Sequence, residues 1–112
     1  MINLDGYQKS LNRWQNEQLG EMTDQQIALG MAEEVGEICH LILKRSQNIR
    51  EGHTLSDKEF REEVADGVAD TLVFGLQLLT IYGVEAEDTM VSVFEKVLSR
   101  NWNKDRAGVT HT

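Results

Sequence analysis

Two groups of acidic side chains fall on helix faces that are otherwise apolar, where a carboxylate is costly to bury. The chain carries nineteen Asp and Glu residues, and most of them lie on polar faces or near expected helix starts. At about 100° per residue along a helix, Glu34 falls between Met31 and Ile38 on an apolar stripe. Glu37 lies at the edge of the same stripe, and Glu33 points further out. This helix is therefore expected to turn carboxylates towards the protein interior.

A second acidic group lies on the next long apolar segment. Glu63, Asp66 and Asp70 share one narrow arc, because residues three, four and seven apart lie on the same helix face. The arc continues into Phe74, so these acids share a face with core candidates. Two successive helices are thus expected to bring carboxylates together.

Carboxylates that are buried together need positive charge beside them. Leaving them unpaired costs more than a small domain's net stability of about 5–15 kcal/mol absorbs. Mg²⁺ takes one or two carboxylates, keeps several waters and completes its shell with substrate phosphates. It also activates water and neutralises charge on a leaving group. The pattern therefore favours a magnesium site that binds a phosphorylated substrate.

The same acids also have a purely structural interpretation. Helical bundles often pair acids with bases as inter-helix salt bridges, and the nearby bases are Lys44, Arg45, Lys58 and Arg61. The residues alone leave both interpretations open. Other chemistries lack their motifs in the sequence, which has no glycine-rich phosphate loop, no zinc-spaced Cys or His pairs and no nucleophile elbow.

Composition limits the class of protein and of partner. A chain of 112 residues has room for one domain, residues 1–112. Its net charge of −8 disfavours a nucleic acid polymer as partner, and a phosphorylated ligand needs bridging cations. The single cysteine, Cys39, is expected to be a small buried hydrophobic residue, and no secretion signal opens the sequence, which favours the cytoplasm. The longest apolar stretch, residues 72–82, is too short to span a bilayer, so no membrane partner is expected.

The absence of proline and the hydrophobic spacing favour an all-α fold. In a first helix that ends near Gly20, one apolar face would be lined by Leu4, Tyr7, Leu11 and Trp14. Capping boxes at residues 23–26 and 56–59 predict the starts of two long helices, over about residues 24–46 and from residue 57 to Gly83. The polar segment 46–55 between them is expected to be a loop.

A fourth helix is expected from about residue 86 to Asn101, with an irregular tail after about Lys104. The back half of the third helix is apolar nearly all round, which is more surface than three short neighbouring helices cover in a monomer. The sequence therefore predicts a four-helix, all-α bundle that is completed by oligomerisation.

The string Glu33-Glu34-Val35-Gly36-Glu37 resembles the E-E-x-G-E signature of the MazG-like nucleoside triphosphate pyrophosphohydrolases, an all-α superfamily. In that family a second acidic motif, commonly E-x-x-D, follows on the next long helix. An apolar run to a glycine and a helix with an Asn-containing end come after it. The chain is similar to this order across nearly its whole length, which implies a MazG-like bundle.

The second motif matches the family in two ways. Residues 63–66 fit E-x-x-D directly. The distance to Gly83 instead assigns the aspartate position to Asp70, and Gly67 then stands where the family has glutamate. Asp66 and Asp70 together also look like the D-x-x-x-D version of some relatives.

The resemblance implies a mechanism and the residues that serve it. Mg²⁺, with Mn²⁺ as a substitute, would bind the triphosphate of a (deoxy)nucleotide, and a water oriented by a carboxylate would attack the α-phosphorus. The products would be the monophosphate and pyrophosphate, in a housecleaning role for the nucleotide pool. The implied metal ligands are Glu34, Glu37, Asp66 and Asp70. The implied catalytic residues are Glu33, Glu34 and Glu63, with Glu33 or Glu63 as the base.

Substrate contacts and assembly are implied in the same way. Residues 100–104 look similar to an N-x-x-K element whose amide and ammonium, here Asn101 and Lys104, contact the nucleotide. Trp14 is a candidate for stacking on the base. Family members are homodimers or homotetramers with the site near a subunit interface.

Two other functions are consistent with the sequence. Phosphoribosyl-ATP pyrophosphohydrolases share the helical architecture and the acidic motifs. A non-catalytic helical bundle that binds a partner or a metal ion would keep the same acids in a structural role.

Overall fold

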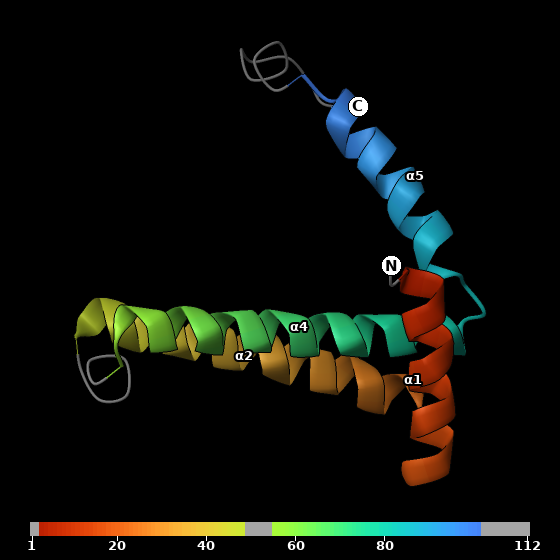
Figure 1. The fold of residues 1–112 in the computed structure, drawn as a ribbon, viewed down its shortest axis with the longest axis horizontal. Coiled ribbons are helices and arrows are strands. Elements are labelled where there is room, and N and C mark those ends of the chain that lie inside the picture. The colour runs from red at the N-terminus through yellow and green to blue at the C-terminus, as the bar shows by residue number, and fades with distance from the viewer. Residues whose placement is uncertain (1–2, 49–54, 102–112) are drawn as a thin grey trace.

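The structure is a computed structural model that describes residues 3–48 and 55–101. Within these ranges it is all-helical and contains no strand, as the sequence predicts. The helices are α1 (Leu4–Gln18), α2 (Asp24–Gln47), α4 (Asp57–Ile81) and α5 (Ala86–Ser99), drawn in Figure 1. Most of the expected 46–55 loop and the tail after Lys104 lie outside the described residues.

Both predicted capping boxes are present at the starts of the long helices. The Thr23 hydroxyl accepts from the Gln26 backbone N–H at 3.1 Å, and the Gln26 side chain accepts from the Thr23 backbone N–H at 2.9 Å. Ser56 and Glu59 form the same pair of bonds at the start of α4. These bonds satisfy backbone donors that the first helical turn leaves open. They fix where the two longest helices begin.

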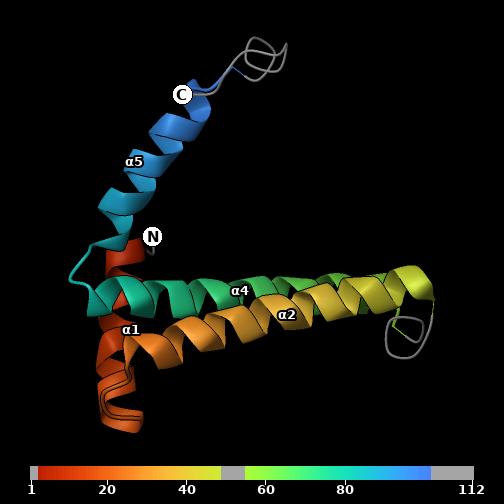
Figure 2. The same cartoon turned by 180° about the vertical axis from the view of Figure 1, so that it is seen from behind.

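Helices α2 and α4 run antiparallel, side by side, as one long pair (Figures 1 and 2). Glycines let their backbones come close at two points. A Cβ added to Gly30 would lie 2.7 Å from the Phe74 ring, and one added to Gly67 would lie 2.6 Å from Ile38 Cγ1. Any larger residue would have to displace its neighbour at these points. The pair is therefore held at a short separation through its middle.

The buried face of α1 differs from the predicted one. Leu4, Tyr7 and Trp14 are 37–50% exposed, whereas Gln8 and Gln15 are buried. The Gln8 amide donates to Val84 O at 2.8 Å and accepts from Ala86 N at 2.9 Å. The turn between α4 and α5 leaves these backbone groups open, and an amide satisfies them where an apolar side chain cannot.

A second buried amide joins α1 to α4. The Gln77 amide donates to Gln15 Oε1 at 3.1 Å, which brings a polar contact into the crossing of the two helices. Figure 1 places α1 across one end of the α2–α4 pair. At the same end, the Tyr82 hydroxyl donates to Asp24 Oδ2 at 2.6 Å and ties the end of α4 to the start of α2. Polar contacts thus secure this end of the pair.

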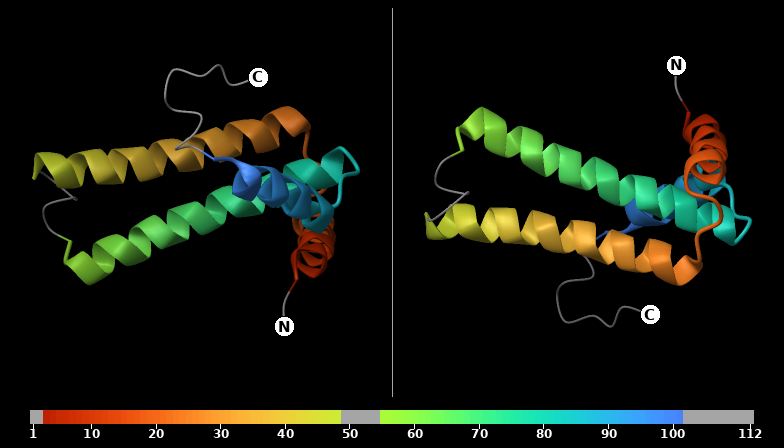
Figure 3. Two further views of the ribbon diagram at one scale, coloured as in Figure 1. Left: turned by 90° about the horizontal axis from the view of Figure 1, so that it is seen from above. Right: turned by 90° about the horizontal axis from the view of Figure 1, so that it is seen from below.

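The four helices do not enclose a common core within one chain. Helix α5 packs on α1 and leans away from the α2–α4 pair (Figures 1 and 3). Among the described hydrophobic residues, only Ile27 and Ala86 are fully buried. Ile42 on α2 and Val68 on α4 are exposed, and so is Cys39, which was expected to be buried. Large apolar surfaces on α2, α4 and α5 therefore face solvent in the single chain.

The length of α4 differs from the expectation that every apolar stretch is too short to span a membrane. By length and composition alone α4 is the one described helix that is long and apolar enough, with a mean hydropathy of 1.4 over eighteen residues. A core helix of a soluble protein meets the same criterion. The most apolar part of α4 still includes Asp66 and Asp70.

Alanine at two glycines tests the close packing of α2 on α4. Gly67→Ala should lower the free energy of unfolding by about 1 kcal/mol or more, because overpacking of this kind costs about 1–3 kcal/mol. Gly36→Ala is the matched control, since a Cβ there meets nothing within 4 Å. It should raise stability by about 0.5–1 kcal/mol through helix propensity. Thermal and denaturant unfolding measure both, and equal effects would contradict the close approach at Gly67.

Candidate functional site

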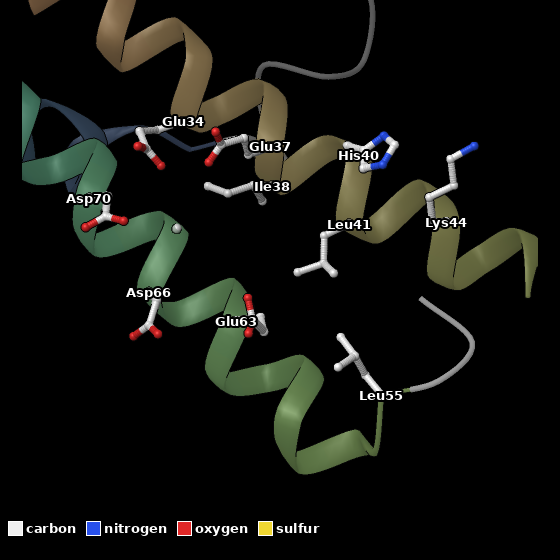
Figure 4. Close-up of a pocket in the computed structure, with 11 residues that line it drawn as sticks. Glu34, Glu37, Ile38, His40, Leu41, Lys44, Leu55, Glu63, Asp66 and Asp70 are labelled. Atoms are coloured by element: carbon white, nitrogen blue, oxygen red, sulfur yellow. The ribbon is translucent and has the colours of Figure 1, made fainter. Parts of the chain in front are cut away.

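A cavity of about 440 Å³ lies between α2 and α4 and extends to both sides of the Gly67–Ile38 contact (Figure 4). Its volume is in the range of small-molecule sites. Its lining contains most of the acids that the sequence singles out, together with apolar and basic residues. The lining residues are Glu34, Glu37, Ile38, His40, Leu41, Lys44, Leu55, Glu63, Asp66, Gly67 and Asp70.

Three carboxylates from two helices face one another at one end of this cavity. Figure 4 shows Glu34 and Glu37 on α2 turned towards each other and towards Asp70 on α4. Glu34 is half-buried, and this burial raises the pKa of its carboxyl above the ordinary value. The negative charges of Glu37 and Asp70 raise that pKa further. Negative charge is therefore concentrated at this end of the cavity, and the raised pKa of Glu34 shows its effect most clearly.

The acids of α4 do not all face α2, because Gly67 is the residue that contacts Ile38 on α2. Glu63 and Asp70 point into the gap between the helices, but the Asp66 carboxylate points away from α2, although the residue lines the cavity (Figure 4). The stripe that faces α2 runs through residues 63, 67, 70 and 74, because Gly67 and Phe74 make the closest contacts. Asp66 lies at the edge of that stripe. The expected single arc of three acids is thus reduced to two that face the gap and one at the rim. All three are exposed in the single chain, so the expectation that they are buried was wrong.

The other predicted site residues lie apart from the cavity in the single chain. Glu33 and Trp14 are exposed and do not line it. Asn101, just beyond α5, is exposed and does not line it either, since α5 leans away from the pair. Lys104 lies outside the described residues.

The salt-bridge interpretation of the cavity acids has no support among the described residues. Arg45 pairs with Asp57, and Lys58 lies 3.9 Å from Glu62. Lys44 donates to the Gln47 side chain at 3.4 Å. Within the described part of the chain, no ion pair involves a carboxylate that lines the cavity. No cation of the described residues therefore lies at bonding distance from these carboxylates.

Two features of the site were missed from the sequence. Gly67 leaves room for Ile38 between the helices, which a helical-face argument does not reveal. Leu55 lines the far end of the cavity and is held there by Arg45, which donates to Leu55 O at 2.7 Å. The only signal for Leu55 was an apolar residue at the end of a polar loop.

The donor set suits a hard divalent cation. Within the described residues, no three His, Cys, Asp or Glu side chains are already arranged to hold a metal ion. Mg²⁺ does not need such a cage, because it binds through one or two carboxylates and fills its shell with water and phosphate oxygens. Glu34, Glu37 and Asp70 supply carboxylates of this kind in a cavity large enough to admit phosphates as well. The residues present therefore fit magnesium.

The pKa of Glu34 gives a pH-dependent test of this crowding. A carboxyl whose pKa is raised on folding stabilises the protein at low pH, and that contribution is lost as pH rises through the raised pKa. Glu34→Gln should therefore raise the melting temperature at neutral pH, and its advantage should shrink towards acid pH. Thermal unfolding between pH 4 and pH 8 measures the effect, with Glu17→Gln on an exposed face as control. An advantage that is the same at every pH would contradict the crowding.

The chain matches no protein-family model, no curated protein and no solved structure in three comparisons with known proteins. Function is therefore inferred from the cavity and the residues that line it, together with the motif in residues 33–37.

Proposed function

We propose that the protein is a magnesium-dependent, MazG-like nucleotide pyrophosphohydrolase that converts (deoxy)nucleoside triphosphates into monophosphates and pyrophosphate. One observation carries this proposal. Carboxylates of α2 and α4 face one another across a cavity, and no protein cation within the described residues pairs with them. Such a group attracts a divalent cation, and the cation lets an acidic protein hold a polyphosphate.

The inward acids divide into two roles in this proposal. Glu34, Glu37 and Asp70 would hold magnesium, or manganese in its place. When bound, the metal ion supplies charge neutralisation at the triphosphate and lowers the pKa of water. Glu63 points into the same gap about two turns before Asp70 on α4. It lines the cavity and Glu33 does not, which supports Glu63 as the base. Asp66 lies at the rim of the cavity, so its carboxylate would act only at the edge of the site.

The reaction needs a base, a positioned water and a leaving group. The Glu63 carboxylate accepts a proton from the water as its oxygen bonds to the α-phosphorus. The bond between that phosphorus and the oxygen that bridges to the β-phosphate breaks, and pyrophosphate leaves with the electron pair. Glu34, Glu37 and Asp70 would keep the triphosphate end in place by holding the divalent cation that binds it.

The exposed apolar faces support an assembly of two or four identical chains. Helix α5 contributes little to a core in the single chain, and Val93, Phe94 and Val97 on it are exposed. A homodimer or homotetramer would cover such faces. In that assembly Trp14, Asn101 and Lys104 would approach the carboxylates of a neighbouring copy.

Pyrophosphate release tests the activity directly. With millimolar Mg²⁺ the purified protein should release pyrophosphate from deoxy- or ribonucleoside triphosphates, and EDTA should abolish the release. Phosphoribosyl-ATP, tested in parallel, separates this activity from that of the related histidine-pathway enzymes. Absence of turnover on every canonical and modified nucleotide would favour the non-catalytic, partner-binding bundle instead.

Matched substitutions on α4 test the assignment of the second motif. Asp70→Asn should lower kcat by at least about 100-fold, equivalent to about 2.7 kcal/mol of barrier, because Asp70 faces Glu34. Asp66→Asn should have a clearly smaller effect, since its carboxylate points away from α2. Steady-state kinetics compares the two, with circular dichroism to verify folding. The reverse order of effects would assign the motif to Asp66.

A further inference from the structure

The cavity between α2 and α4 has two ends of different chemistry. The carboxylates of Glu34, Glu37 and Asp70 gather at one end, and Leu41 and Leu55 lie at the other (Figure 4). The two leucines are half-buried and face each other across the gap, one from α2 and one from the segment that leads into α4. A ligand that fills the cavity would therefore meet a group of carboxylates at one end and two leucines at the other, where Glu63, His40 and Lys44 also line the cavity.

The apolar end is open because the helices splay apart. The helices come close where Gly67 admits Ile38, and the pair diverges towards its 47–57 end (Figure 3). Leu41 and Leu55 lie on the diverging side, so that their side chains approach the gap without closing it. A ligand that covers this apolar surface removes it from water, which favours binding.

The position of Leu55 is fixed by Arg45. The guanidinium donates to Leu55 O at 2.7 Å, forms an ion pair with Asp57 and lies 4.8 Å from the centroid of the Phe60 ring. These contacts join the end of α2 to the start of α4. The leucine end of the cavity is thus held between the end of α2 and the start of α4.

We infer that this apolar end receives the uncharged base of the nucleotide, with Leu41 and Leu55 as the residues that contact it. The inference rests on the proposed function, which places the triphosphate among the carboxylates with magnesium. The rest of the ligand must then extend along the cavity, and its planar, uncharged part fits the leucines by chemistry. Leucine side chains carry no hydrogen-bonding groups with which to distinguish base edges. Discrimination between the bases would therefore depend on Glu63, His40 and Lys44, which line the same end.

Binding of two probes separates the base from the phosphates. The probes are the four α,β-methylene deoxynucleoside triphosphates and inorganic tripolyphosphate, each titrated by calorimetry with Mg²⁺ into the intact protein. Leu41→Ala and Leu55→Ala should each weaken the nucleotide analogues by about fivefold or more and leave tripolyphosphate unchanged. Leu43→Ala is the matched control, since Leu43 is half-exposed on α2 and lies outside the cavity. Retained tripolyphosphate binding also verifies that the variants fold.

Other outcomes overturn the inference in distinguishable ways. If the leucine variants bind nucleotide as the wild type does, or lose both probes equally, the base lies elsewhere and the proposed function still stands. If the variants change the association state in sedimentation and bind both probes normally, the leucines belong to a subunit interface. If the wild type binds neither probe with Mg²⁺, the proposed function fails and the base subsite fails with it.

Discussion

The close approach of α2 and α4 is the constraint on which the rest of the structure depends. Gly30 meets the Phe74 ring, and Gly67 meets Ile38, so the two longest helices share a narrow seam. The seam decides which residues face across it. It brings Glu34 opposite Asp70, where partial burial and neighbouring charge raise the pKa of the Glu34 carboxyl. The glycine at position 67 thus allows the close packing that brings the carboxylates of the two helices near one another.

The single chain leaves this seam only partly covered. One end is tied by Tyr82 to Asp24 and by the buried amides of α1, and the other by Arg45 to Asp57. Between these ends, apolar residues of both long helices face solvent, and α5 leans away from them. Polar contacts therefore fix the helix ends, whereas hydrophobic burial, which usually stabilises a helical domain most, is incomplete without another chain. The proposed assembly of identical chains would cover these apolar faces.

Local signals were predictable from the sequence, and contacts between elements were not. The capping boxes at Thr23 and Ser56 depend on neighbouring residues alone, so the starts of α2 and α4 were predicted correctly. The inward direction of Glu34 and Asp70 followed from helical periodicity. The face of α1 was predicted wrongly, because Gln8 is buried to satisfy backbone groups of a turn far along the chain. The prediction that Asp66 points inward was wrong. Which residue of α4 faces α2 depends on how the two helices are rotated against each other, and Gly67 makes that contact.

The central claim is that carboxylates of two helices form a divalent cation site across this seam. Titration of Mn²⁺, followed by the loss of the free ion's electron paramagnetic resonance signal, measures it without any assumption about the substrate. The account predicts saturable binding to the wild type, binding that is lost in Asp70→Asn and retained in Glu17→Gln. Saturable binding that survives Asp70→Asn, or no saturable binding to the wild type, would contradict it.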